Sequence, residues 1–128
     1  MGKKKKLLAI SSPSGGGKST VARYLLNKYD NLKFSVSATT RKPRANEING
    51  RDYFFLTKEA FIKKISEGEL IEYEEIFGNY YGTLKSEVEK AKSSNYSLLF
   101  DIDVKGALSI KRIYPDDSLL IFISPPTL

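Results

Sequence analysis

The chain has 128 residues, 41% of them hydrophobic and 28% charged, which is the size and composition of one ordinary globular domain and excludes a largely disordered protein. No apolar run approaches the length of about 20 residues that a membrane-spanning helix needs, so we expect a cytoplasmic protein with no membrane partner. Because the chain contains no Cys and no His, disulfides, thiolate chemistry and the commonest general base are excluded. Phosphoryl transfer is compatible with this restriction, since it depends mainly on positioning and charge neutralisation.

The formal net charge of +6 suggests an anionic partner, but a lysine run near the start, Lys3 to Lys6, supplies four of these charges. We interpret this run as a solvated basic tail before the first strand, and we expect no specific nucleic-acid partner. The alternative is a nucleic-acid-binding protein that uses these lysines, which would show strong and salt-dependent binding to oligonucleotides.

The first predicted elements are a buried strand, a glycine-rich loop and a helix, in that order. Leu7–Ser11 is a short apolar run that stops at the sequence Ser-Pro-Ser-Gly-Gly-Gly of residues 12–17. From Lys18 to about Tyr29, apolar residues recur at helical spacing. A phosphate-binding loop requires this order of strand, loop and helix.

The middle of the chain has a different pattern. We predict a short strand at Phe34–Ser37, a polar stretch over 39–47, a strand at Tyr53–Leu56, a helix at Lys58–Glu67 and a strand at Leu70–Glu75, followed by the sequence Gly-Asn-Tyr-Tyr-Gly of residues 78–82. This section is typical of an inserted and partly antiparallel lobe.

The last part returns to the pattern of a buried core. A charged helix is predicted at Lys85–Ser93, a buried strand ending in a carboxylate at Ser97–Asp101, a helix at Val104–Ile113 and a further buried strand at Leu119–Ile123. We therefore predict the α/β class, with a parallel sheet flanked by helices. The predicted division is a core formed by 1–37 and 94–128, with the lobe at 38–93.

The glycine-rich loop is the strongest single signal for a ligand. Glycines allow successive backbone N–H groups to point at a phosphate, and the helix that follows adds its positive end. The candidate ligands of the ATP phosphates are Ser14, Gly15, Gly16, Gly17, Lys18, Ser19 and Thr20, with Lys18 also catalytic and Ser19 also a ligand of Mg²⁺. Ser12 stands where the strict G-x-x-x-x-G-K-[ST] pattern has its first Gly. The alternative is a flexible turn with Ser19 as a helix cap, and the loop alone leaves ATPase, GTPase and kinase open.

Several motifs together are similar to those of guanylate kinases in both content and order. They are Ser-Ala-Thr-Thr-Arg-Lys-Pro-Arg at 37–44, Asn-Gly-Arg-Asp-Tyr at 49–53, Leu-Ile-Glu-Tyr at 70–73, Gly-Asn-Tyr-Tyr-Gly-Thr at 78–83 and Asp-Ile-Asp at 101–103. The resemblance implies a P-loop kinase core with an inserted mixed α/β lobe that binds GMP. It also implies a transfer of the γ-phosphoryl group of ATP to GMP, with Mg²⁺ as the cofactor.

The resemblance assigns the acceptor phosphate to Arg41, Arg44, Tyr53 and Tyr81, and the two arginines are also predicted to be catalytic. Guanidinium groups are planar forks of donors that match a dianionic phosphate, and tyrosine hydroxyls add further donors. Taken singly, each of these side chains has an ordinary alternative as a surface charge or a half-buried aromatic residue.

The resemblance assigns the guanine base to Glu72, Ser37 and Thr83, with Asp101 and Asp103 near both the base and the metal. A carboxylate such as Glu72 accepts from the N1–H and N2 amino groups of guanine, whereas adenine presents an acceptor at N1. Thr83 stands where the family often has Ser. Asp101 is a predicted Mg²⁺ ligand together with Ser19, while Asp103 has a competing role as a helix cap before Val104.

Two alternatives to the enzyme remain at this point: a non-catalytic guanylate-kinase-like interaction module and an inactive fragment. The family continues beyond the Pro-Pro segment with an arginine-bearing lid, a last strand and a terminal helix, which this sequence lacks. We therefore expect a binding-competent chain in which catalysis is impaired. The last strand would pair beside Leu119–Ile123, so the chain is expected to have an apolar sheet edge there.

Overall fold

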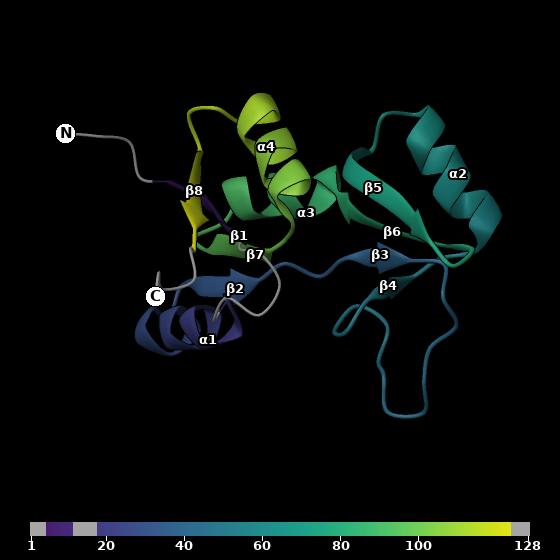
Figure 1. The fold of residues 1–128 in the computed structure, drawn as a ribbon, viewed down its shortest axis with the longest axis horizontal. Coiled ribbons are helices and arrows are strands. Elements are labelled where there is room, and N and C mark those ends of the chain that lie inside the picture. Colours follow the sequence, from purple (N-terminus) through teal and green to yellow (C-terminus); the bar gives the residue numbers. More distant parts are fainter. Residues whose placement is uncertain (1–4, 12–17, 124–128) are drawn as a thin grey trace, which may run out of the picture. The chain divides into compact units, whose positions relative to one another are not determined.

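The structure is a computed structural model that describes residues 5–11 and 18–123, without the side chains of Lys18 and Ser19. The chain divides into two compact units, residues 1–35 with 90–128, here called the core unit, and residues 36–89, here called the lobe (Figure 1). None of the helices in the described ranges has the length and apolar character needed to cross a membrane.

The core unit is built on a parallel sheet of four strands. They are β1 (Leu7–Ser11), β2 (Leu32–Phe34), β7 (Ser97–Asp101) and β8 (Ser118–Phe122), in the order β2-β7-β1-β8. Leu7 pairs with Leu98 on one side and with Ser118 on the other. Central strands of a parallel sheet are buried on both faces, which explains the uninterrupted apolar runs of β1 and β7.

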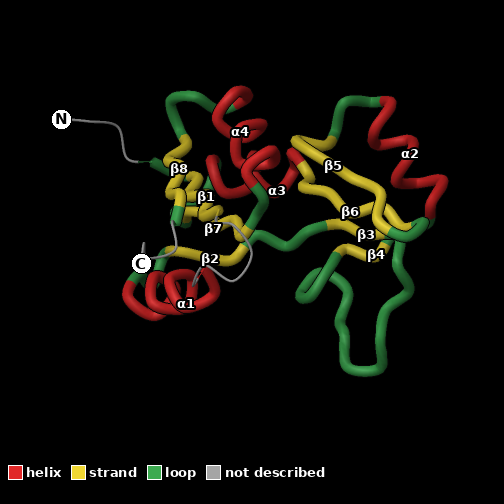
Figure 2. The backbone as a smooth tube through the Cα atoms, in the orientation of Figure 1, coloured by secondary structure: helices red, strands yellow, loops and turns green. Residues whose placement is uncertain are grey.

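Helices cover both faces of this sheet (Figure 2). The helix α1 (Lys18–Lys28) packs on β1, β2 and β7, where Ile10, Ala22 and Leu99 form a buried cluster. The helix α4 (Val104–Ile113) packs on β1 and β8 and buries Ala107 and Ile110. Side chains alternate along β1, so neighbouring residues serve the two faces in turn.

The carboxyl ends of the strands gather the segments that carry the predicted chemistry. β1 leads to residues 12–17 and then to α1, while β7 ends at Asp101. The amide of Ile102 donates to the carbonyl of Ile10 at 3.2 Å, and the amide of Ile123 donates to the carbonyl of Ser11 at 2.9 Å. In open α/β sheets, ligands bind at this edge.

The lobe contains a mixed sheet and one helix of its own. The strands are β3 (Ala38–Thr39), β4 (Phe54–Phe55), β5 (Leu70–Ile76) and β6 (Asn79–Leu84), in the order β4-β3-β6-β5, and the helix is α2 (Lys58–Ser66). Only the β3–β4 pair is parallel. The hydroxyl of Thr57 caps α2 by accepting from the amide of Ala60 at 3.1 Å. The helix α3 (Lys85–Lys92) follows β6 and runs across the division between the units.

One face of the lobe sheet packs against α2. Phe61 of α2 is fully buried with Ala38 and Leu84, and its ring stacks on Tyr80 with centroids 5.2 Å apart. A Cβ on Gly82 would lie 3.1 Å from the Phe61 ring and 2.8 Å from the carbonyl oxygen of Glu72, so glycine is required at this approach. The alternation of side chains leaves the intervening residues of these strands on the opposite face.

Most predicted elements are confirmed, and three expectations are corrected. The bounds of β1, β7 and α4 are those predicted, whereas the predicted strand Phe34–Ser37 is wrong because β2 already ends at Phe34. β6 was not predicted, because its Gly-Asn-Tyr-Tyr-Gly sequence resembles a turn. Lys6 differs from a solvated tail, because its ammonium group donates to the carbonyls of Ser94 and Tyr96.

Candidate functional site

The lobe brings three of the predicted phosphate ligands together on the sheet face opposite α2. Thr39 of β3 pairs directly with Tyr81 of β6, and Arg41 follows two residues later. The rings of Tyr53 and Tyr81 meet edge to face with centroids 6.3 Å apart. The guanidinium carbon of Arg41 lies 5.1 Å from the Tyr53 ring centroid and 5.9 Å from that of Phe55. An Arg and two tyrosines from separate segments therefore form one cluster.

Arg41 is held by a network of hydrogen bonds rather than extended into solvent. Its backbone amide donates to the Thr39 hydroxyl at 3.1 Å, and that hydroxyl donates to the Tyr80 carbonyl at 2.9 Å. Its Nη1 and Nη2 donate to the two carboxylate oxygens of Glu47, each at 2.9 Å. The side chains of Arg41 and Glu47 are only 15% and 18% exposed, so this is a partly buried ion pair with the bidentate geometry of a strong one.

The electrostatics of this pair follow from its hydrogen bonds. The Arg41 guanidinium and the Arg44 backbone amide both donate to Glu47, and they lower the pKa of that carboxyl from 4.5 to about 2. In turn, the Glu47 carboxylate raises the pKa of Arg41, and the hydroxyls of Tyr53 and Tyr81 raise it further. Arg44 itself is exposed, and its amide donates to Oε1 of Glu47 at 2.8 Å.

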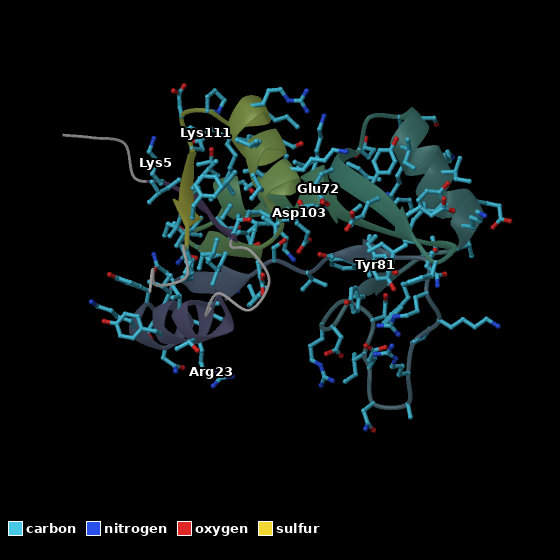
Figure 3. The ribbon with its side chains drawn as sticks, in the orientation of Figure 1. Lys5, Arg23, Glu72, Tyr81, Asp103 and Lys111 are labelled. Carbon is cyan, nitrogen blue, oxygen red and sulfur yellow. The ribbon has the colours of Figure 1, made fainter. Side chains whose placement is uncertain are left out.

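The predicted base ligands Glu72 and Thr83 are also brought together. They face each other across β5 and β6, and the Thr83 hydroxyl donates to Oε2 of Glu72 at 3.0 Å. An irregularity in the β5–β6 register falls between Leu70 and Glu72. Thr83 is 3% exposed, while Glu72 is half-buried, so a buried hydroxyl orients a reachable carboxylate. Figure 3 labels Glu72 on β5 and Tyr81 on β6.

Ser37 directly precedes β3, and the antiparallel β3–β6 register, with Ala38 opposite Gly82, continues to place it opposite Thr83. It is half-buried just before β3, where its carbonyl accepts from the amide of Phe54 at 2.8 Å. That hydrogen bond continues the β3–β4 pairing, so the backbone of Ser37 stabilises the lobe sheet. The assignment of its hydroxyl to the base stays a prediction.

The remaining site residues belong to the core unit. Asp101 ends β7 with an exposed side chain, and the Asp103 carboxylate caps α4 by accepting from the amide of Gly106 at 2.7 Å. The helix-cap role considered for Asp103 is thus confirmed. Lys18 and Ser19 begin α1 and Thr20 is exposed in its first turn, while the predicted ligands Ser14 to Gly17 lie outside the described residues.

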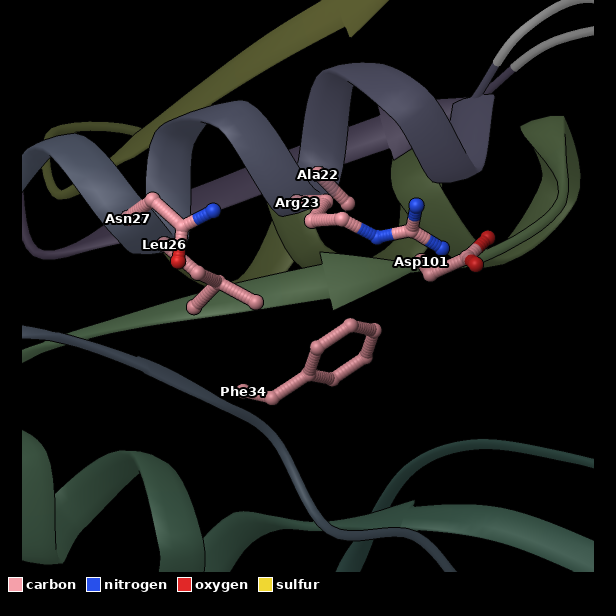
Figure 4. Close-up of a pocket in the computed structure, with 6 residues that line it drawn as sticks. All are labelled: Ala22, Arg23, Leu26, Asn27, Phe34 and Asp101. Carbon is pink, nitrogen blue, oxygen red and sulfur yellow. The ribbon is translucent and has the colours of Figure 1, made fainter.

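A pocket of about 320 Å³ lies beside these residues in the core unit. It is lined by Ala22, Arg23, Leu26, Asn27, Phe34 and Asp101, from α1 and the ends of β2 and β7. The guanidinium group of Arg23 is directed toward the Asp101 carboxylate (Figure 4). Among the described residues, no group of three or more His, Cys, Asp or Glu side chains gathers as a metal site would.

Glu47 is the functional candidate that the sequence did not reveal. Glu47 is an acidic residue three positions after Arg44 and six after Arg41, in a loop without a periodic pattern. A carboxylate at those spacings in a basic loop is the only local signal, and it is weak. Its pairing with Arg41 depends on the folded conformation of the loop.

Comparisons with known proteins identify the relatives of this chain. Residues 4–128 match the family model described as guanylate kinase. The chain is 52% identical over 123 residues to a guanylate kinase of Chlorobaculum tepidum, covering 96% of this chain and 63% of that protein. It is 53% identical over 125 residues to a guanylate kinase of Porphyromonas gingivalis, covering 96% of this chain and 66% of the relative.

A solved structure gives the same result at the level of the fold. The crystal structure of guanylate kinase from Anaplasma phagocytophilum superimposes with a TM-score of 0.71 at 39% sequence identity. The match covers 97% of this chain and 62% of that one. The chain thus spans less than two thirds of the length of these relatives.

Proposed function

The chain belongs to the guanylate kinase family, and from this premise we propose that the protein transfers the γ-phosphoryl group of ATP to GMP. The observation that supports the acceptor most directly is the arrangement of the lobe face. A guanidinium group lies with two tyrosines in one cluster, and a carboxylate oriented by a buried hydroxyl lies on neighbouring strands of the same sheet. Donors for a phosphate and an acceptor for a base edge are what a nucleoside monophosphate requires.

The lobe residues would hold the acceptor through complementary charges and hydrogen bonds. Arg41, Arg44, Tyr53 and Tyr81 donate to the phosphate of GMP, which places one of its oxygens as the nucleophile. Glu72 accepts from the two adjacent N–H groups of guanine, and Thr83 fixes the direction of that carboxylate. Adenine has a lone pair where guanine has N1–H, so AMP would leave the Glu72 charge without a donor.

The core unit would hold the donor through backbone amides. Residues 14–17 and the first turn of α1 bind the phosphates of ATP, with Lys18 on the transferred group. The fully buried Ser11 hydroxyl, which lacks a hydrogen-bond partner within the described ranges, ends β1 where this loop begins. No residue needs to remove a proton from a weak nucleophile, because the acceptor is already an anionic phosphate oxygen.

Two oxygen-bearing residues of the core unit, one at the end of β7 and one in α1, support the proposal of a magnesium ion. Asp101 has an exposed carboxylate in register with Ile10 of β1, and Ser19 is the second residue of α1. Carboxylates and hydroxyls carry the hard oxygen ligands that Mg²⁺ prefers. We propose that these two residues hold the Mg²⁺ that accompanies ATP. When bound, this ion supplies charge neutralisation at the transferred phosphoryl group.

Substitution of Glu72 tests the proposed substrate. Glu72→Gln keeps the shape of the side chain but offers only one acceptor, so we expect affinity for GMP to fall about 10-fold to 100-fold, as for the loss of a charge-assisted bond. Affinity for Mg²⁺·ATP is expected to stay unchanged. Isothermal titration with both nucleotides, and a coupled assay of GMP against AMP and UMP, provide the measurement.

The same experiment separates the enzyme from a binding module. Equal loss of GMP and ATP affinity in Glu72→Gln would contradict the assigned role. If the wild-type protein binds no Mg²⁺·ATP, the non-catalytic interaction module becomes the better account. Turnover of AMP as fast as GMP would contradict the role of Glu72 in base selection.

A further inference from the structure

Glu47 makes contacts that none of the roles assigned so far explains. Its Oε1 accepts from Nη1 of Arg41 at 2.9 Å and from the amide of Arg44 at 2.8 Å, while its Oε2 accepts from Nη2 of Arg41 at 2.9 Å. One acidic side chain therefore bonds to both arginines of an anion site. An acid at this position opposes the charge of a phosphate, so its presence calls for a geometric reason.

The reason lies in the two edges of the Arg41 guanidinium. An arginine has five N–H donors, arranged so that Nη1 and Nη2 form a terminal edge and Nε and Nη2 form a side edge. Glu47 takes the terminal edge, and the remaining Nη1 donor goes to the Lys42 carbonyl at 3.0 Å. The two parallel N–H groups of the side edge have no carboxylate partner in the described part of the chain, and the neutral hydroxyls of Tyr53 and Tyr81 are the groups that interact with them.

Neighbouring aromatic rings also lie close to the guanidinium group. Its carbon lies 5.1 Å from the Tyr53 ring and 5.9 Å from the Phe55 ring. The hydroxyls of Tyr53 and Tyr81 act on the same group, because each contributes to the raised pKa of Arg41. With the terminal edge occupied, the side edge and these hydroxyls are the donors that we infer for one oxyanion, because a hydroxyl that accepts from Arg41 keeps its own O–H to donate.

We propose that Glu47 is a positioning residue of the acceptor site, which holds Arg41 so that its Nε and Nη2 edge meets the phosphate of the monophosphate substrate. This inference rests on the proposed function and adds a residue to it. Glu47 touches neither nucleotide and acts through Arg41 and through the Arg44 backbone. Glu47 forms its ion pair with Arg41. The side chain of Arg44 is exposed and forms no ion pair within the described part of the chain, so its positive charge is available to the phosphate.

A comparison of GMP with guanosine isolates this role, because the two ligands differ only in the phosphate. In Glu47→Gln, an amide NH₂ would face one Arg41 N–H group, donor against donor, and the guanidinium would turn away from the phosphate. We expect the ratio of guanosine to GMP dissociation constants to fall about tenfold, with guanosine affinity unchanged. Isothermal titration of the whole protein gives both constants.

Asp52→Asn is the matched control. Asp52 lies in the same loop and accepts from the amide of Ile48 at 2.8 Å and from Arg51. Within the described residues it forms no hydrogen bond or ion pair with Arg41 or Arg44. Its substitution removes the same charge and disturbs the same loop. We expect its ratio of dissociation constants to match the wild type or to rise slightly, since a nearby negative charge is lost.

The outcomes are distinct. An unchanged or increased ratio in Glu47→Gln overturns the positioning role, the second result showing that Glu47 only repels the phosphate. A wild-type protein that binds GMP no better than guanosine contradicts the proposed function itself. If Glu47→Gln misfolds and loses guanosine binding, the variant Arg41→Lys provides the test. Lysine keeps the positive charge but lacks the Nε and Nη2 edge. An unchanged ratio of guanosine to GMP dissociation constants in Arg41→Lys would overturn the inference.

Discussion

The core unit and the lobe build their candidate binding sites in opposite ways. In the core unit, the proposed donor site is a continuous stretch of sequence from β1 through residues 12–17 into α1, and its proposed ligands are largely backbone amides. In the lobe, the acceptor site is assembled from a loop after β3, a residue before β4 and facing residues of β5 and β6. A continuous site depends on local conformation, whereas an assembled site depends on strand register and on side-chain pairing.

The lobe compensates for this dispersion by fixing its charged groups in advance. Arg41 is paired with Glu47, and Glu72 is bonded to Thr83. Groups that are already oriented lose less freedom when a ligand binds, which favours affinity and selectivity. The units should therefore respond differently to substitution, and three predictions examine that difference.

The largest effect is expected from Lys18→Ala in the core unit. The lysine would stabilise charge on the transferred group, so its loss should lower the turnover number by about 10²-fold to 10³-fold, as for the removal of one preorganised donor. Affinity for GMP should remain that of the wild type, because the lobe carries its own ligands. A coupled assay and a GMP titration measure the two quantities. A loss of both turnover and GMP affinity would contradict the independence of the donor site and the acceptor site.

A second prediction compares one glycine from each unit. In Gly82→Ala the new Cβ would meet the backbone oxygen of Glu72 at 2.8 Å, whereas in Gly106→Ala it would meet the side chain of Ile102 at 2.6 Å. A backbone carbonyl in a sheet moves less easily than a side chain does. We expect Gly82→Ala to lower the free energy of unfolding by about 1–3 kcal/mol and to weaken GMP binding.

Gly106→Ala should lower the free energy of unfolding less than Gly82→Ala, because the new Cβ meets side-chain atoms of Ile102 and Asp103 rather than backbone, and because the higher helix propensity of alanine offsets part of the cost. Urea unfolding of both variants gives the comparison. If Gly106→Ala lowered the free energy of unfolding more than Gly82→Ala, the backbone of the lobe sheet would tolerate a shift that α4 does not.

The smallest effect concerns acid. Because the pKa of Glu47 is lowered from 4.5 to about 2 in the folded lobe, its ion pair contributes stability that is complete above about pH 4.5 and is lost as the pH falls toward 2. Hydrogen exchange read separately for the two units at pH 6 and pH 3 should show a loss of protection in the lobe. Glu47→Gln should lack this component, and an unaltered acid response in that variant would contradict the assignment.

The elements that could be predicted from the sequence are those whose pattern is local. β1, β7 and α4 have the predicted bounds because apolar runs and helical spacing suffice to define buried parallel strands and an amphipathic helix. β6 was missed because the sequence Gly-Asn-Tyr-Tyr-Gly of residues 78–82 indicates a turn, and only pairing with β3 and β5 makes 79–84 a strand. The strand predicted at Phe34–Ser37 was wrong since the chain passes there from one unit to the other.

The candidate site shows the same limit. The glycine-rich loop can be interpreted from its own residues, but the roles of Arg41, Tyr53 and Glu72 came from a resemblance of ordered motifs rather than from any local pattern. Glu47 could not be found in this way, because its importance lies in a contact that spans six residues of irregular loop. Such hydrogen bonds depend on the folded conformation of the loop, which no local sequence pattern specifies.

The most direct measurement is a crystal structure of the protein with GMP bound. The account predicts that the phosphate lies against Arg41, Arg44, Tyr53 and Tyr81, with the Arg41 side edge toward it, and that the guanine N1–H and N2 groups point at Glu72. A GMP molecule bound in the lobe with its base away from Glu72, or bound outside the lobe, would contradict it.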